Sequence, residues 1–181
     1  MGLLFQNYAL FPNMTVEQNI LCALKKEKDP AARRAACAEA LRAMRLEELA
    51  KRLPGALSGG QQQRAALARI LAAKPRILML DEPFSALDSY LREEVEGEVG
   101  SLLAGFAGTA LLVTHNRDEA YRLCREMIVM DGGEVLRAGT TKEVFADPRT
   151  RAAARLTGCK NILPCTPLDS HTVRLDGWNT T

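Results

Sequence analysis

The chain has 181 residues, of which 47% are hydrophobic and 25% are charged, and this composition excludes a wholly disordered protein. The 24 basic and 22 acidic side chains leave a net charge of +2, which is too small to indicate a nucleic-acid surface by itself. No apolar run approaches the ~18 residues of a membrane helix, and no signal-peptide pattern opens the chain. The five cysteines form no Cys-x-x-Cys pair, so we expect reduced thiols in a soluble cytosolic chain.

Helix-start signals recur along the chain. A Ser, Thr or Asn followed three residues later by Gln or Glu is typical of a capping box, and an Asp-Pro pair places proline in the first helical turn. On these signals we predict helices from Thr15, from Asp29 to about Leu49, from Ser58 to about Ala73, from Asn116, from Thr140, and from Asp147 to Gly158.

Strand signals are fewer and are of two kinds. Residues 77–80 and 110–113 are continuous apolar runs, each followed by a helix, which predicts strands buried on both faces of a parallel sheet. Residues 127–130 and 134–136 flank Asp-Gly-Gly and predict a β-hairpin. The order of elements indicates an α/β fold with a helical insertion near its front.

Two adjacent acids, Asp81 and Glu82, follow the first of these strands. Ligands bind at the carboxyl ends of strands in open α/β sheets, and unpaired acids are costly to bury. One acid suits a Mg²⁺ shell, and the next suits the orientation or deprotonation of a water that attacks a phosphate. The alternative is that both acids simply begin a solvated loop.

A serine and two glycines, Ser58-Gly59-Gly60, precede Gln61 at the start of a predicted helix. The free N–H groups and positive dipole end of a helix start attract anions, and glycine lets a ligand approach the backbone, so this segment predicts a phosphate-binding element. A capping box with a flexible entry loop is the alternative, although it does not explain two consecutive glycines. The Gly-x-x-x-x-Gly-Lys-[Ser/Thr] pattern is absent, since Gln61 stands where lysine is required after Gly55 and Gly60.

These motifs resemble the ATP-binding-cassette (ABC) ATPase family. Its motifs occur in family order as Phe5-Gln6-Asn7 (Q-loop), Leu57-Ser58-Gly59-Gly60-Gln61 (signature), Leu80-Asp81-Glu82-Pro83 (Walker B), Ser85-Ala86-Leu87-Asp88 (D-loop) and Val113-Thr114-His115 (H-loop). The resemblance implies a P-loop NTPase-like ABC ATPase core with a mostly parallel sheet, over residues 1–161, and a helical subdomain at about 12–57. Residues 162–181 are then a linker and the start of an incomplete regulatory domain.

The resemblance also implies the cofactors ATP and Mg²⁺ and a division of roles around them. Gln6 would contact Mg²⁺ and the attacking water, Asp81 would hold Mg²⁺, Glu82 would act as general base, and His115 would bond the γ-phosphate. The alternative for His115 is a satisfied histidine that caps the helix at Asn116.

A second group of residues is implied to act across a head-to-tail homodimer. Ser58, Gly59 and Gly60, with Gln61, would bind the γ-phosphate of ATP held by the opposite subunit. Asp88 would contact the facing subunit.

The family's adenine-stacking aromatic and P-loop lysine lie upstream of the Q-loop, where this chain starts. We therefore expect an N-terminally truncated fragment that, by itself, neither binds MgATP normally nor hydrolyses it. A chain that naturally lacks a P-loop is the alternative. The strand that feeds the P-loop lies inside the family's sheet, so its neighbours should expose edges and apolar faces.

The last third resembles the end of the cassette in bacterial importers of molybdate, sulfate, polyamines or sugars, and residues 156–161 look most like the oxyanion (molybdate-type) branch. The function implied is the ATP-hydrolysing subunit of an importer, peripheral at the cytoplasmic face of the inner membrane. Its partners would be integral membrane permeases, docked on a helical block that includes residues 8–14, with no nucleic acid. A non-catalytic interaction module and a soluble ABC ATPase acting on DNA or ribosomes are the alternatives.

Overall fold

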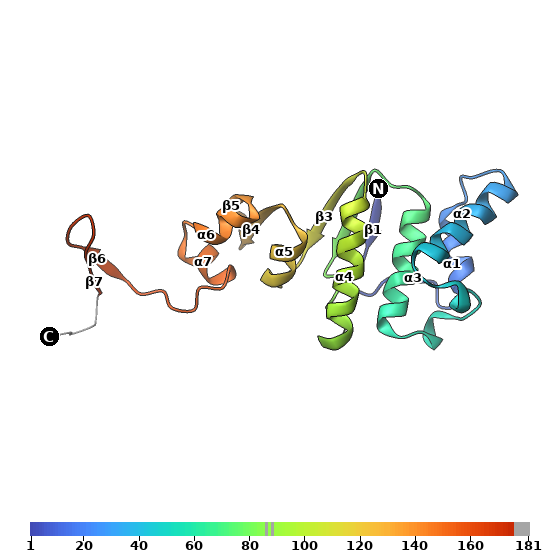
Figure 1. Ribbon diagram of the computed structural model, residues 1–181, viewed down its shortest axis with the longest axis horizontal. Coiled ribbons are helices and arrows are strands. Elements are labelled where there is room, and N and C mark those ends of the chain that lie inside the picture. The colour runs from blue at the N-terminus through green and yellow to red at the C-terminus, as the bar shows by residue number, and fades with distance from the viewer. Residues whose placement is uncertain (86, 88, 176–181) are drawn as a thin grey trace. The chain divides into compact units, whose positions relative to one another are not determined.

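A computed structural model describes residues 1–85, 87 and 89–175, with the backbone alone at positions 89–91 and 94 (Figure 1). The chain divides into two compact units, Met1–Glu119 and Ala120–Thr181. Among the described residues, no helix combines the length and apolarity needed to cross a bilayer.

The first unit is built on a parallel sheet of three strands, in the order β1 (Gly2–Leu4), β2 (Ile77–Asp81) and β3 (Thr109–Val113). Leu4 lies opposite Leu80, and Asp81 opposite Val113, so the carboxyl ends of all three strands meet at one edge. The parallel pairing of β2 with β3 is confirmed. The sequence pattern missed β1, because three residues are too few to display a period.

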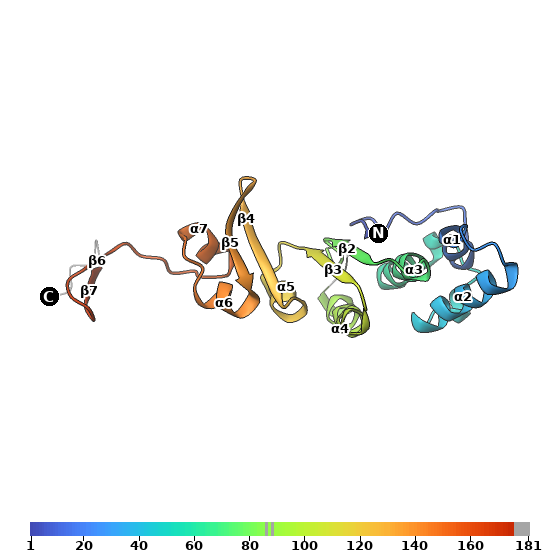
Figure 2. The same cartoon turned by 90° about the horizontal axis from the view of Figure 1, so that it is seen from above.

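The two faces of this sheet differ in burial. Leu4, Leu78 and Leu80 are buried on one face, and Figure 2 shows α4 (Ser89–Gly105) along one side of the strands. On the other face, Ile77 and Leu111 are 44% and 48% exposed. The prediction that both faces are buried is therefore wrong for the described chain, because its helices cover only one of two apolar faces.

A helical block packs beside the sheet. Its members are α1 (Val16–Ala23), α2 (Pro30–Ala43), the 3₁₀ turns η1 (Glu47–Leu49) and η2 (Pro54–Ala56), and α3 (Gly59–Ala72). The buried side chains of this block are Val16, Ile20, Leu24, Cys37, Ala40, Leu41, Leu46, Leu57, Ala65 and Ala68. The capping boxes predicted at Thr15 and Ser58 are both confirmed.

Helix α2 ends earlier than the predicted Leu49. Arg45 adopts a φ of 52° and its N–H bonds the Arg42 carbonyl at 3.1 Å, while the Leu46 N–H bonds the Leu41 carbonyl at 2.9 Å. This pair of bonds is a Schellman motif, which usually places glycine at the left-handed position. Burial of Leu46 in the helical core, at 0% exposure, accompanies the stop.

The second unit is a β-hairpin with short helices. Strands β4 (Glu126–Asp131) and β5 (Glu134–Thr140) are antiparallel, which confirms the predicted hairpin. The turn residues Gly132 and Gly133 have φ values of 56° and 84°, as a two-residue hairpin turn requires. Helices α6 (Thr141–Ala146) and α7 (Arg151–Leu156) follow, and α5 (Arg117–Leu123) spans the boundary between the units.

Helix α7 starts at Thr150 rather than at the predicted Asp147. The Thr150 hydroxyl accepts the Ala153 N–H at 3.1 Å, whereas Asp147 closes α6 by donating its N–H to the Glu143 carbonyl at 2.8 Å. The predicted stop at Gly158 is confirmed by its φ of 107°. A last antiparallel pair, β6 (Cys165–Pro167) and β7 (Val173–Leu175), lies in the segment predicted to be a linker and incomplete domain, and that prediction stays a prediction.

We predict that Asn19→Ala lowers the free energy of unfolding by about 2–3 kcal/mol, measured by urea denaturation. The buried Asn19 amide accepts the Phe11 N–H at 2.8 Å and donates to the Phe11, Met14 and Thr15 carbonyls, so its loss removes the side-chain partner of the Phe11 N–H and of the Met14 carbonyl. Asn13→Ala, at an exposed position of the same loop, is the control. Equal effects of the two substitutions would contradict the prediction.

Candidate functional site

Glu82 and His115 meet at the carboxyl edge of the sheet. Glu82 follows β2 and donates its N–H to the Val113 carbonyl at 2.9 Å. Its Oε1 accepts the His115 N–H at 2.9 Å and lies 2.7 Å from His115 Nδ1. The Glu82 side chain is 21% exposed and that of His115 is 79% exposed, so the carboxylate is the more buried partner of a pair at the surface.

The backbone of Glu82 is strained. Its φ of 46° lies in the left-handed region, which costs a non-glycine residue on the order of 1 kcal/mol. Its carbonyl accepts hydrogen bonds from the Ser85 hydroxyl at 2.8 Å and the Ser85 N–H at 3.2 Å. Together with the bond from its N–H to Val113, these contacts hold the turn in a conformation that the isolated residue disfavours.

Asp81 and Gln6 lie at the same edge. Asp81 ends β2, and Gln6 follows β1 in a turn closed by the Tyr8 N–H on the Phe5 carbonyl at 2.8 Å. Both side chains are exposed. No three His, Cys, Asp or Glu side chains in the described ranges are grouped to hold a metal ion. One carboxylate and one amide oxygen nevertheless suit Mg²⁺, which usually binds few protein ligands and completes its shell with phosphate and water oxygens.

Arg69, which no sequence motif singles out, anchors the loop after Gln6. Its guanidinium donates to the Ala9 carbonyl at 2.7 Å and the Tyr8 carbonyl at 3.2 Å, and lies 5.6 Å from the centre of the Phe11 ring. Tyr8 and Ala9 have φ values of 58° and 45°, and burial raises the pKa of the Tyr8 hydroxyl. The contact joins residues 60 positions apart, so no local pattern could indicate it.

The predicted signature residues form a helix cap. The Ser58 hydroxyl accepts the Gln61 N–H at 3.3 Å, and the Gln61 side chain accepts the Ser58 N–H at 3.0 Å. Gly59 and Gly60 open α3, and because α3 leads through a short turn into β2, its N terminus points toward the carboxyl edge (Figure 1). The phosphate-binding role of these four residues stays a prediction. Asp88, predicted to contact a second subunit, lies outside the described residues.

Glu119 bonds the side chains of both neighbours of His115, whereas the Asn116-x-x-Glu119 spacing predicted a capping box. Its carboxylate accepts the Thr114 hydroxyl at 2.5 Å and the Asn116 amide at 3.0 Å, and the cap of α5 is instead the Asn116 Oδ1, which accepts the Asp118 N–H at 2.9 Å. The predicted capping box is therefore wrong in its geometry. The Thr-x-Asn-x-x-Glu spacing was the available signal.

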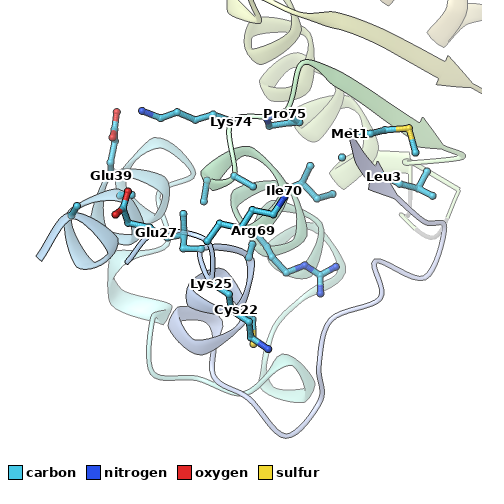
Figure 3. Close-up of a pocket in the computed structure, with 18 of the residues that line it drawn as sticks. Met1, Leu3, Cys22, Lys25, Glu27, Glu39, Arg69, Ile70, Lys74 and Pro75 are labelled. Carbon is cyan, nitrogen blue, oxygen red and sulfur yellow. The ribbon is translucent and has the colours of Figure 1, made fainter. Parts of the chain in front are cut away.

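An open pocket of about 1160 Å³ lies among α1, α2, α3 and the start of β1 (Figure 3). Ala9 and Phe11 line it from the loop after Gln6, and Lys25, Arg69 and Lys74 supply basic groups. None of the residues predicted to act on a nucleotide lines it. The pocket is therefore separate from the Glu82–His115 edge.

Comparison with known proteins identifies the family. Residues 1–85 match the ABC transporter family. The chain is 43% identical over 162 residues to the putrescine transport ATP-binding protein PotG of Escherichia coli (strain K12), covering 89% of this chain and 43% of PotG. It is 43% identical over 164 residues to the spermidine/putrescine import ATP-binding protein PotA of Bacillus thuringiensis (strain Al Hakam), covering 90% of this chain and 50% of that protein. The chain thus spans half or less of these relatives.

Solved structures agree with the sequence match. The dimeric structure of a post-hydrolysis state of the ATP-binding cassette MJ0796, bound to ADP and Pi, is similar with a TM-score of 0.65 and 34% identity, over 77% of this chain and 62% of that one. A dimeric structure of MJ0796 as a bacterial ABC transporter cassette has a TM-score of 0.66 at the same 34% identity, over 78% and 62%. Together these findings identify an ABC ATPase cassette in this chain and confirm the predicted α/β fold class.

The names of the similar proteins bear on the predicted substrate class. PotG and PotA are named for polyamines, so the oxyanion (molybdate-type) assignment is not supported. The predicted N-terminal truncation and the inactivity of the isolated chain stay predictions.

Ser58→Ala should lower the free energy of unfolding by about 1 kcal/mol, because it removes the cap of α3, whereas Ser58→Asp should leave it nearly unchanged. Thermal unfolding followed by circular dichroism compares the two variants with the wild type. If Ser58→Ala proved as stable as the wild type, the cap would not contribute as described.

Proposed function

We propose that this chain is the ATP-binding and ATP-hydrolysing part of an ABC importer subunit that energises polyamine uptake. The observation that carries the proposal is the contact of Glu82 with His115 beside Asp81, at the edge of the sheet where ligands bind. The names of the similar proteins supply the substrate class.

In the proposed reaction, Glu82 orients or deprotonates the water that attacks the γ-phosphate, since its carboxylate is the less exposed partner of the pair. His115 turns Nδ1 toward Glu82, which leaves Nε2 to face the phosphate. Asp81 and Gln6 would hold Mg²⁺, which when bound neutralises charge on the phosphate oxygens. These four residues account for orientation and proton transfer at one edge of the sheet.

The proposal includes a second copy of the chain. Ser58, Gly59 and Gly60 open a helix whose N–H groups suit an anion, and they sit on a different element from Glu82. In a head-to-tail dimer, with Gln61 holding the cap and Asp88 at the facing subunit, this helix start would reach the nucleotide of the partner. Both similar structures of MJ0796 are dimeric, which supports a second copy as partner.

Membrane permeases are the other proposed partners. The pocket among α1, α2 and α3 is lined by alanines of α2 and by Phe11, which is 48% exposed. Basic and acidic side chains also line it, among them Lys25 and Glu39 (Figure 3). The loop that carries Phe11 begins directly after Gln6, and through this loop a docked partner would be linked to the nucleotide. The chain would then be peripheral at the cytoplasmic face of the inner membrane.

Glu82→Gln in the assembled transporter should reduce ATP hydrolysis at least ~100-fold while ATP-bound dimers accumulate, because the amide cannot accept the proton of water. Phosphate release and size-exclusion chromatography measure the two effects. Glu93→Gln, an exposed carboxylate of α4, is the matched control. Undiminished hydrolysis by the Glu82 variant would remove Glu82 from its proposed role.

Membrane vesicles that contain the assembled transporter should take up labelled spermidine or putrescine when ATP is supplied, and the Glu82→Gln variant should not. The measurement is ATP-dependent accumulation of label, with molybdate as the competing substrate. Uptake of molybdate without polyamine uptake would overturn the substrate assignment and leave the ATPase proposal intact.

A further inference from the structure

We propose that Glu119 is a positioning residue for His115, acting through the two residues that flank it. The inference rests on the proposed function only in its consequence for hydrolysis, since the positioning itself can be measured on the chain without nucleotide. The observation behind it is a buried carboxylate that bonds both neighbours of an exposed histidine.

The bonds form a closed network. The Thr114 hydroxyl donates to Glu119 Oε2 at 2.5 Å and accepts the Asn116 N–H at 3.0 Å, and the Asn116 side-chain amide donates to Glu119 Oε1 at 3.0 Å. Each carboxylate oxygen of Glu119 therefore accepts one side-chain hydrogen bond, one from the residue before His115 and one from the residue after it. The three-residue turn is fixed at both ends.

Burial gives this network its stiffness. Glu119 is only 3% exposed, whereas Thr114 and Asn116 are half-buried. Burying a carboxylate costs free energy unless hydrogen bonds satisfy it, so breaking the bond from Thr114 or from Asn116 is unfavourable. Successive side chains of the turn therefore point to opposite sides. Thr114 and Asn116 bond Glu119, and the His115 ring, which is 79% exposed, faces outward.

A second carboxylate holds His115 itself. Glu82 Oε1 accepts the His115 N–H at 2.9 Å and lies 2.7 Å from Nδ1. A carboxylate accepts but does not donate, so this short contact selects a ring that carries hydrogen on Nδ1. Glu119 thus fixes the backbone of the turn, and Glu82 then fixes the ring.

The test uses ¹⁵N-labelled full chain and long-range ¹H–¹⁵N spectra of the imidazoles. The chain has two histidines, so His171→Gln assigns the His115 signals. Glu119→Gln replaces one of the two accepting oxygens by an NH₂, so Thr114 and Asn116 can no longer both donate to position 119. Glu119→Gln combined with Asn116→Asp restores a donor–acceptor pair with reversed roles. Asp118→Asn is the matched control, because that carboxylate is 64% exposed on the same helix.

The wild type and Asp118→Asn should give a His115 ring that carries hydrogen on Nδ1. Glu119→Gln should lose that preference, and hydrogen exchange at the His115 amide should become about tenfold faster or more. The reversed pair should restore both signals. Unchanged ring and amide signals in Glu119→Gln, or no recovery in the reversed pair, would overturn the inference.

Thr114→Val covers the case in which Glu119→Gln fails to fold, because it removes one of the two bonds to Glu119 at nearly constant volume. It should also weaken the Nδ1 preference, and an unaltered His115 spectrum would count against the proposal.

Hydrolysis by the assembled transporter separates this inference from the proposed function. Glu119→Gln should lower kcat by roughly 10- to 100-fold with little change in KM for ATP, and the reversed pair should recover activity. If the His115 signals respond as expected but hydrolysis is unaffected by Glu119→Gln and by His115→Ala, then the positioning is right and the role of His115 in the reaction is wrong.

Discussion

The Glu82 carboxylate, held beside His115 at the end of a parallel sheet, is the constraint on which the site depends. One carboxylate oxygen accepts the His115 N–H and contacts the His115 ring. The backbone N–H of Glu82 bonds the Val113 carbonyl at the end of β3. The sheet register makes this possible, because β2 and β3 end level with one another at Asp81 and Val113. A shift of register by one residue would turn each side chain to the other face and separate the pair.

Strain and support accompany one another around this edge. Glu82, Tyr8 and Ala9 all have positive φ values, and each stretch is held by a side-chain hydrogen bond to its backbone. Arg69 supports the loop after Gln6, as Ser85 supports the turn at Glu82. Backbone conformations that cost free energy persist only where the surroundings over-determine them, and they concentrate at functional sites. The strained backbone at Glu82 coincides with the proposed chemistry, whereas Arg45, Lys74 and Arg149 adopt positive φ values away from this edge.

What the sequence could predict was governed by distance along the chain. The capping boxes at Thr15, Ser58 and Thr140 and the Gly132-Gly133 turn depend on neighbours within three residues, and all are present. The stop of α2 at Arg45 was missed because a non-glycine residue takes the left-handed position, and the burial of Leu46 that accompanies it depends on the folded core.

The same distinction between local and distant contacts holds for the candidate site. The strand ends and the family motifs placed Asp81, Glu82 and His115 at one edge, because parallel strands end together. The support of Glu119 and Arg69 depends on side-chain contacts that form only after the chain has folded, so composition and period could not reveal it. The apolar open face of the sheet was visible in the sequence, but not which face the helices would cover.

The most direct test of the account is a structure of the assembled transporter with a non-hydrolysable ATP analogue. We expect the γ-phosphate within hydrogen-bond distance of His115 Nε2, a water between that phosphate and Glu82, and the N terminus of α3 from the second copy on the opposite side. A nucleotide bound with its phosphates away from Glu82 and His115 would contradict it.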